Sequence, residues 1–168
     1  MNRLVRLVCI ASALSLAAGC ASGRKDNLMR ERAGQHVYSQ PASQVYAGAV
    51  QLLKEKKFGL REDPKNFTAV SEWKQESGGS SLGTVWTAMQ VMVKPLSPSS
   101  CTVMFIKKNR VEGGTTPDET RYGGSKGEAS VANNSSGGRD LAMELELLQR
   151  LDPAVAEAIR ASADQAVP

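Results

Sequence analysis

Histidine is scarce in this chain. His36 is the only histidine among 168 residues, and it lies in a polar, charge-rich stretch without a run of core residues. A single imidazole excludes a metal site built from several histidines. It also argues against a Ser-His-Asp arrangement, because the many serines have no base beside them. We therefore interpret His36 as a surface residue and predict neither a metal ion nor a non-covalent cofactor.

Long hydrophobic runs are also missing. The largely apolar run from Leu4 to Ala18 falls short of the about 20 residues that a membrane-spanning helix needs. Arg3 and Arg6 give this segment a positive flank, and it ends in small residues. These features are typical of a secretory signal peptide that is removed by cleavage. Residues 1–19 are therefore predicted to be a signal peptide.

The end of that segment carries a recognisable motif. Residues 16–20 read Leu-Ala-Ala-Gly-Cys and resemble the lipobox of bacterial lipoproteins, in which Ala17 stands where leucine is most common. The resemblance implies signal peptidase cleavage between Gly19 and Cys20, a diacylglycerol thioether on Cys20, and a third acyl chain, such as palmitate, on its new amino group. Several acyl chains anchor a protein stably, at about 0.8 kcal/mol for each buried methylene. The alternative is an ordinary secretory signal with an incidental cysteine.

The lipobox resemblance also implies a location. Ala21 follows the cysteine where lipoproteins retained in the inner membrane often carry aspartate. The expected location is therefore the outer membrane, with the protein facing the periplasm. The membrane, reached through the lipid anchor, is the first expected partner, and another envelope protein is the second.

Cysteine is limited to three residues. Cys9 would leave with the signal peptide and Cys20 would be acylated, so only Cys101 would remain. The mature chain could then form no internal disulfide, even in an oxidising compartment. Because Cys101 opens an apolar, strand-like run, we predict a buried thiol that acts as a small hydrophobic residue.

The charge balance gives no sign of a nucleic-acid partner. The whole chain has 21 basic and 17 acidic residues, for a net charge of +4. Removing residues 1–19 takes away Arg3 and Arg6 and no acid, which leaves 19 basic and 17 acidic residues. A net charge of +2 does not indicate nucleic-acid binding.

The mature chain is predicted to contain one domain. Residues 20–39 are expected to form a flexible polar tether, residues 40–161 a single α+β domain, and residues 162–168 a frayed tail. Apolar residues at helical spacing predict a helix from about Pro41 to Lys57. Further helices are expected from Asp140 to Leu151 and again from Asp152-Pro153, where aspartate suits the N-cap and proline the first turn.

Four segments are predicted to form strands. Phe58 to Glu62 and Asn66 to Lys74 flank an acidic turn, with Phe67, Ala69, Val70 and Trp73 as candidate inward residues. Thr84 to Lys94 alternates between one continuous apolar face and a second, mixed face, and Cys101 to Lys108 is its expected hairpin partner. We interpret the methionines and aromatic residues as core. The expected fold class is α+β, a small antiparallel β-sheet of about four strands packed against N-terminal and C-terminal helices.

Composition changes abruptly from Arg110 to Gly138, where three glycine pairs lie among Ser, Thr and Asn. A structureless stretch of this length is uncommon inside a compact domain, so residues 110–138 are expected to form a mobile loop or a lid. The run Gly123-Gly124-Ser125-Lys126-Gly127 lacks the residue order and the preceding strand of a phosphate-binding loop. A flexible linker is the favoured interpretation.

No set of catalytic residues is recognisable. General acid–base chemistry needs groups held within hydrogen-bond reach, and the visible carboxylate pairs lie in the flexible segment or do not face each other. An envelope enzyme acting on lipids or glycans would need folding to bring together Glu62, Asp63, Glu72 or Asp118. This remains the alternative hypothesis.

A second resemblance concerns the run from Ser39 to Asp63. It is similar to the opening helix and strand of small helix-grip domains, which occur in accessory lipoproteins of the outer-membrane β-barrel assembly machinery. The similar segments are Gln44-Val45-Tyr46, Leu52-Leu53-Lys54 and Phe58-Gly59-Leu60, followed by an acidic turn. The resemblance implies a sheet gripped by helices and a role in binding envelope proteins, and it assigns no functional residue.

The sequence therefore favours a lipoprotein that is not an enzyme and that acts as a binding or scaffold module, in outer-membrane protein assembly or envelope maintenance. The sheet edge, a helix face or the Gly-rich loop could provide the contact. A structural spacer is a further possibility outside both hypotheses.

Overall fold

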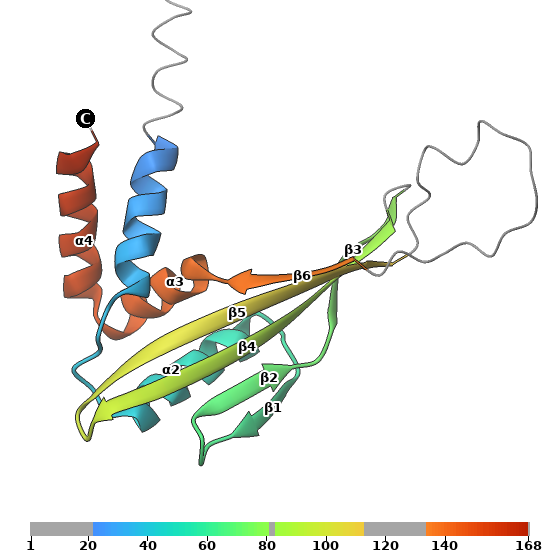
Figure 1. The fold of residues 1–168 in the computed structure, drawn as a ribbon, viewed down its shortest axis with the longest axis horizontal. Coiled ribbons are helices and arrows are strands. Elements are labelled where there is room, and N and C mark those ends of the chain that lie inside the picture. The colour runs from blue at the N-terminus through green and yellow to red at the C-terminus, as the bar shows by residue number, and fades with distance from the viewer. Residues whose placement is uncertain (1–21, 81–82, 113–133, 168) are drawn as a thin grey trace, which may run out of the picture. The chain divides into compact units, whose positions relative to one another are not determined.

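The computed structural model describes residues 22–80, 83–112 and 134–167 (Figure 1). The fold belongs to the α+β class, as predicted. The chain divides into two compact units. One consists of the N-terminal residues through His36 together with Leu141 to the C-terminus, and the other consists of Val37–Asp140. The predicted signal peptide, Gly19 and Cys20 lie outside the described residues.

Helix α2 (Ala42–Glu55) forms the helical part of the second unit. Val45, Ala49, Leu52 and Leu53, the stripe expected from the sequence, are all fully buried. This confirms the helix predicted from Pro41 to Lys57, with ends that fall one or two residues inside the expected limits. Lys57 closes the helix in a left-handed conformation, with φ of 61°.

The sheet in the described part of the second unit has six antiparallel strands instead of about four. They are β1 (Leu60–Asp63), β2 (Thr68–Ser71), β3 (Lys74–Ser80), β4 (Gly83–Ser97), β5 (Ser100–Glu112) and β6 (Asn134–Arg139). The order is β1-β2-β4-β5-β6, and β3 pairs with the remaining length of β4 beyond β2.

The longest feature of the sheet is the β4–β5 hairpin (Figure 1). Its register pairs Thr84 with Glu112 at one end and Ser97 with Ser100 at the turn, with an irregularity between Pro95 and Ser97. The predicted hairpin is confirmed, and both strands extend beyond the predicted limits. β5 continues to Glu112 because residues 109–112 keep pairing with β4.

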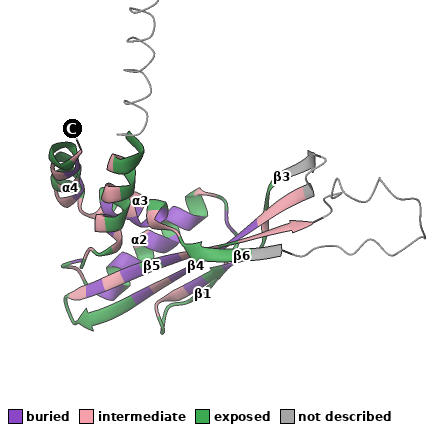
Figure 2. Cartoon of the chain, turned by 45° about the horizontal axis from the view of Figure 1, so that its top comes forward, coloured by how far each residue is buried: buried purple, intermediate pink, exposed green. Residues whose placement is uncertain are grey.

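The core of the second unit lies between α2 and one face of the sheet, as the burial pattern shows (Figure 2). The sheet residues on this side are buried: Ala69, Ser71, Thr87, Met89, Val91, Val93, Cys101, Val103 and Phe105. They alternate along each strand with less buried neighbours, which is the pattern of a sheet covered on one side.

The segment from Asn66 to Lys74 differs from the prediction. It divides into β2 and β3 instead of forming one strand, with Glu72 and Trp73 between them. Of the candidate inward residues only Ala69 is buried, whereas Val70 and Trp73 are exposed. Val70 must point away from α2 because it directly follows the inward-facing Ala69.

The expectation of a loop over residues 110–138 is wrong at both ends. Residues 110–112 belong to β5, and residues 134–139 form β6, whose register on β5 pairs Val111 with Asn134 and Ile106 with Arg139. Strand pairing uses backbone groups, which serine and glycine supply as well as any residue, so composition alone concealed this strand. Residues 113–133 lie outside the described range.

The first unit contains a helix over residues 22–34, together with α3 (Leu141–Leu151) and α4 (Pro153–Ala166). The two C-terminal helices are confirmed, and Asp152 caps α4 by accepting a hydrogen bond from the Val155 N–H at 3.2 Å. None of the helices in the described ranges combines the length and apolar content needed to cross a membrane.

The predicted flexible tether and frayed tail are corrected in this unit. Residues 22–34 are helical, and α4 reaches Ala166. An ion pair between Lys25 and Asp164 and a hydrogen bond from Arg32 to Ser162 join the two segments. Both contacts link residues more than 125 positions apart in the sequence, so local sequence patterns could not reveal them.

Candidate binding surface

The face of the sheet opposite α2 is the most unusual surface of the second unit. Residues paired directly across antiparallel strands point to the same face, so the register defines this face without ambiguity. We call it the open face. In β2, β4 and β5 it consists of Thr68, Val70, Ala88, Gln90, Met92, Lys94, Thr102, Met104, Ile106 and Lys108, and the register continues it through Arg61 and Asp63 of β1 and Gly137 and Arg139 of β6. All of these except Ala88 are exposed or partly exposed.

A strip of apolar side chains runs through the centre of the open face. Met92 pairs directly with Met104, and in the next row Gln90 lies between Val70 and Ile106. Val70 is 45% exposed and Met104 is 38% exposed. An antiparallel sheet that meets water on one side normally turns polar residues outward. This strip departs from that pattern in three neighbouring strands.

Two lysines bracket the apolar strip. Lys94 lies one row beyond the methionine pair, opposite Thr102, and Lys108 lies opposite Ala88 at the other end. Six residues of β4 separate these rows, which corresponds to about 20 Å at about 3.3 Å per residue. Both lysines are exposed, and neither forms an ion pair within the described residues. Arg61 and Arg139 lie beside Val70 and Ile106, and the Asp63 carboxylate lies beside Thr68, so the strip has more basic than acidic neighbours among the described residues.

An aromatic and cationic stack continues the open face toward β3. The Arg110 guanidinium lies 4.6 Å from the ring centroid of Trp73 and 5.5 Å from that of Trp86. Arg110 also pairs with Glu112 at 3.0 Å. Stacking on both indoles holds the Arg110 side chain over the sheet. Trp73 remains partly open to solvent.

A shallow groove lies between α2 and β1 and has a volume of about 330 Å³. Tyr46 and Val50 line it, and the Lys54 Nζ and Glu62 Oε1 atoms form an ion pair across it at 2.6 Å. The Tyr46 hydroxyl donates to the Thr68 carbonyl at 2.9 Å. Burial, followed by the nearby Glu62 carboxylate, raises the pKa of Tyr46 above its ordinary value. These polar groups are already engaged with one another.

A second depression, of about 280 Å³, lies along β5 and β6. Its wall is open because Gly137 and Gly138 contribute no side chains. The polar groups on its β5 side also have partners, since Lys107 pairs with Glu76 at 3.6 Å and Asn109 accepts from Thr87 at 2.9 Å.

Cys101 is fully buried, as the sequence predicted. Its backbone exchanges hydrogen bonds with Tyr38, at 2.9 and 3.1 Å, and its Sγ lies 3.6 Å from the Gln40 carbonyl. Burial raises the pKa of this thiol above its usual range. A buried thiol with a raised pKa is a poor nucleophile, which fits a packing role.

The described candidate carboxylates do not converge. Glu62 faces α2 through its ion pair with Lys54, whereas Asp63, the next residue on β1, points to the opposite side. The Asn66 side chain donates to Asp63 at 2.7 Å, and this hydrogen bond holds the pKa of Asp63 below its usual value. Glu72 lies 3.8 Å from Arg61. Asp118 lies outside the described residues.

The sequence contained a signal for the open face that its interpretation missed. The alternation in Thr84 to Lys94 already separates a mixed face carrying Trp86, Gln90, Met92 and Lys94. Assigning methionines and aromatic residues to the core was correct for Met89 and Met143, which are buried, and wrong for Met104 and Trp73. Only strand order shows that Val70 extends the same surface.

In the part of the chain that the structure describes, no group of three or more His, Cys, Asp or Glu side chains could hold a metal ion. A comparison with protein-family models finds no match for this chain, and no curated protein matches it significantly.

Proposed function

We propose that this chain is a membrane-anchored, non-enzymatic binding protein of the bacterial envelope, and that its open face holds another envelope protein. The observation that carries the proposal is the apolar strip of Val70, Met92, Met104 and Ile106, whose side chains remain exposed or partly exposed in the part of the chain that the structure describes. Contiguous apolar surface rimmed by polar residues is typical of interaction sites. Binding would complete the burial that α2 provides on the other face.

The anchor in this proposal is Cys20, acylated after cleavage between Gly19 and Cys20. The helix over residues 22–34 begins two positions after Cys20, so the proposed lipid would be joined to a folded unit through a very short connection. The proposed location is the outer membrane, facing the periplasm. Outer-membrane protein assembly or envelope maintenance is the process we propose.

An enzyme acting on envelope lipids or glycans remains the other hypothesis. For hydrolysis of a glycosidic bond, it would require two carboxyl groups that flank the bond to be cleaved. Glu62, Asp63 and Glu72 face different directions, so this part of the chain offers that hypothesis no specific support.

The proposal is tested by crosslinking in intact cells, purification of the full lipidated chain, and mass spectrometry of the proteins recovered with it. Met104→Asp places a charge in the apolar strip at an exposed position, where folding is expected to tolerate it. We expect recovery of the partner to fall about tenfold, because an unpaired carboxylate buried in an interface costs more than about 1.4 kcal/mol.

The matched control is Leu96→Asp, which makes the same type of change at the β4–β5 turn, where Leu96 is 54% exposed. It should leave recovery unchanged, and Cys20→Ser should abolish the membrane association. Equal recovery with Met104→Asp and with the unmodified chain would contradict the assignment of the open face. If the unmodified chain recovers no other protein, the result would contradict the proposal that this chain is a binding protein.

A further inference from the structure

We infer that the occupant of the open face is an acidic amphipathic helix contributed by a different envelope protein. This inference rests on the proposed function and makes it specific, because it names the secondary structure and the charge of the partner. It depends on three features of the described residues: the dimensions of the face, the position of its lysines, and the nature of its central side chains.

The dimensions fit one helix. On the other side of the same strands, α2 covers the sheet with 14 residues, or about 21 Å at 1.5 Å per residue. The rows of Lys94 and Lys108 are about 20 Å apart along β4. A partner helix of about four turns would therefore span the apolar strip from one lysine to the other. The sheet would then be covered by helices on both faces, a common layered arrangement.

The charges identify the partner as acidic. Lys94 and Lys108 are exposed and form no ion pair within the described residues, whereas the neighbouring Arg61 and Arg110 already pair with Glu72 and Glu112. Asp63, a carboxylate on the same face, already accepts a hydrogen bond from Asn66. An acidic residue near each end of the partner helix would pair with each free lysine. A second copy of this chain would bring two faces with more basic than acidic residues against each other, which like-charge repulsion disfavours.

The central side chains fit a helical ridge. Met92 and Met104 form a direct cross-strand pair, and their unbranched thioethers adapt to the shape of the surface they meet. Val70 and Ile106 flank the pair. Apolar residues at intervals of three and four along a helix would fill this strip.

The test places the photoreactive residue benzoylphenylalanine at position 104 of the full lipidated chain in cells. Mass spectrometry then identifies the crosslinked segment. We expect a protein segment with apolar residues at helical spacing and acidic residues about 20 Å apart. In the same chain, Lys94→Glu with Lys108→Glu should lower the crosslink yield at least tenfold. Exchanging the partner's acidic residues for lysine should restore it.

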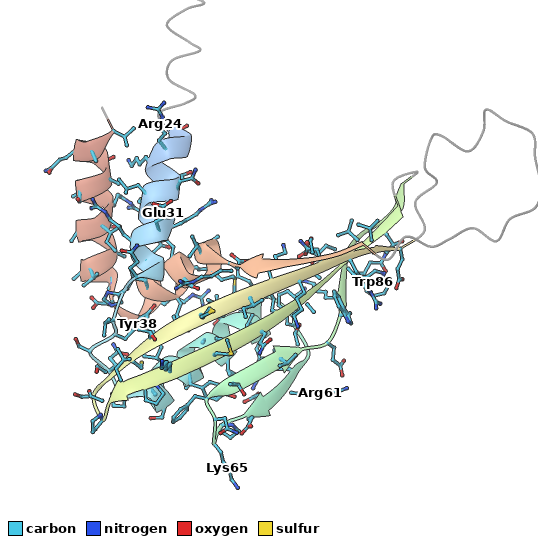
Figure 3. All side chains as sticks on the ribbon, viewed as in Figure 1. Arg24, Glu31, Tyr38, Arg61, Lys65 and Trp86 are labelled. Atoms are coloured by element: carbon cyan, nitrogen blue, oxygen red, sulfur yellow. The ribbon has the colours of Figure 1, made fainter. Side chains whose placement is uncertain are left out.

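The matched control is Lys65→Glu, another exposed lysine of the same unit, which projects from the β1–β2 turn (Figure 3). It should leave the crosslink yield unchanged. Crosslinks to lipid, to a second copy of the chain, or to a basic or extended segment would overturn this inference. So would a yield that is insensitive to the two charge reversals. A basic or extended segment of another protein, or a yield insensitive to the charge reversals, leaves the role of the open face standing. Crosslinks only to lipid or to a second copy overturn the proposed function itself, and so does the absence of any crosslink together with unchanged recovery in Met104→Asp.

Discussion

At the scale of single residues, backbone strain is concentrated at Lys57 and Phe67, which have φ of 61° and 50°. Side chains other than glycine rarely adopt this left-handed region. Lys57 is held there by the end of α2, where its N–H donates to Lys54 at 2.8 Å and the Phe58 N–H donates to Leu53 at 3.1 Å. Phe67 is held by edge-to-face packing on Tyr46, with ring centroids 6.0 Å apart.

Replacing Lys57 with glycine should stabilise the protein. Glycine adopts a left-handed conformation without steric cost and is the residue most common at this position of a helix. We expect Lys57→Gly to raise the free energy of unfolding by about 1 kcal/mol, measured by urea unfolding followed by circular dichroism. Lys56→Gly, at a neighbouring residue with φ of −77°, should lower it. Equal effects of the two substitutions would contradict the strain at Lys57.

At the scale of elements, the β4–β5 hairpin and β2 form a sheet with one covered face and one open face. A shift of the register by one residue would exchange the two faces completely. Ala69 and Val70 are adjacent in β2, yet Ala69 is 1% exposed and faces α2 while Val70 belongs to the open face. This pair of neighbours therefore reports the register directly.

Aspartate at these two positions should have opposite consequences. Ala69→Asp buries an unpaired carboxylate against α2 and should lower the free energy of unfolding by about 3 kcal/mol or more. Val70→Asp should change it by about 1 kcal/mol or less while reducing recovery of the bound partner. Thermal and urea unfolding measure the first effect, and crosslinking measures the second. Strong destabilisation by Val70→Asp would show that the open face is covered within the chain.

At the scale of the whole molecule, the first unit joins segments from the two ends of the described chain, and His36 ends its N-terminal segment. Burial lowers the pKa of His36 below its ordinary value of 6.5, and the negative charge of Asp152 opposes part of this effect. The unfolded chain therefore takes up a proton on His36 more readily than the folded chain does. The contribution of His36 to stability is fully present above pH 6.5 and is lost as the pH falls from 6.5 through the lower pKa of the folded chain.

His36→Gln should remove this pH dependence. Between pH 7.5 and 5.5, the free energy of unfolding should fall more in the unmodified chain than in the variant, because only the unmodified chain couples unfolding to protonation of an imidazole. Urea unfolding at several pH values, all above the range in which carboxylates titrate, measures the difference between the two slopes. Identical slopes would contradict the burial of His36.

The fold was predictable where a pattern is local. The stripe of Val45, Ala49, Leu52 and Leu53 identified α2, and the alternation of β4 identified the hairpin. The Asp152-Pro153 pair marked the start of α4. β6 was missed because its serines and glycines pair through the backbone, and the helix over residues 22–34 was missed because α4 supplies its partners. Only part of the candidate surface could be predicted from the sequence. The alternation in β4 indicates its mixed face, but no local pattern shows that Val70 and Met104 continue that face.

The sequence by itself determined the periodicity of the helices and strands, the burial of Cys101, and the lipobox resemblance on which the proposed anchor depends. These properties follow from residues that are close together along the chain. Only the tertiary structure decided that α2 covers one face of the sheet, that Val70, Met92, Met104 and Ile106 share the other, and that Lys94 and Lys108 bracket them. Strand order and register bring these residues together across three strands, and no local pattern specifies which strands become neighbours.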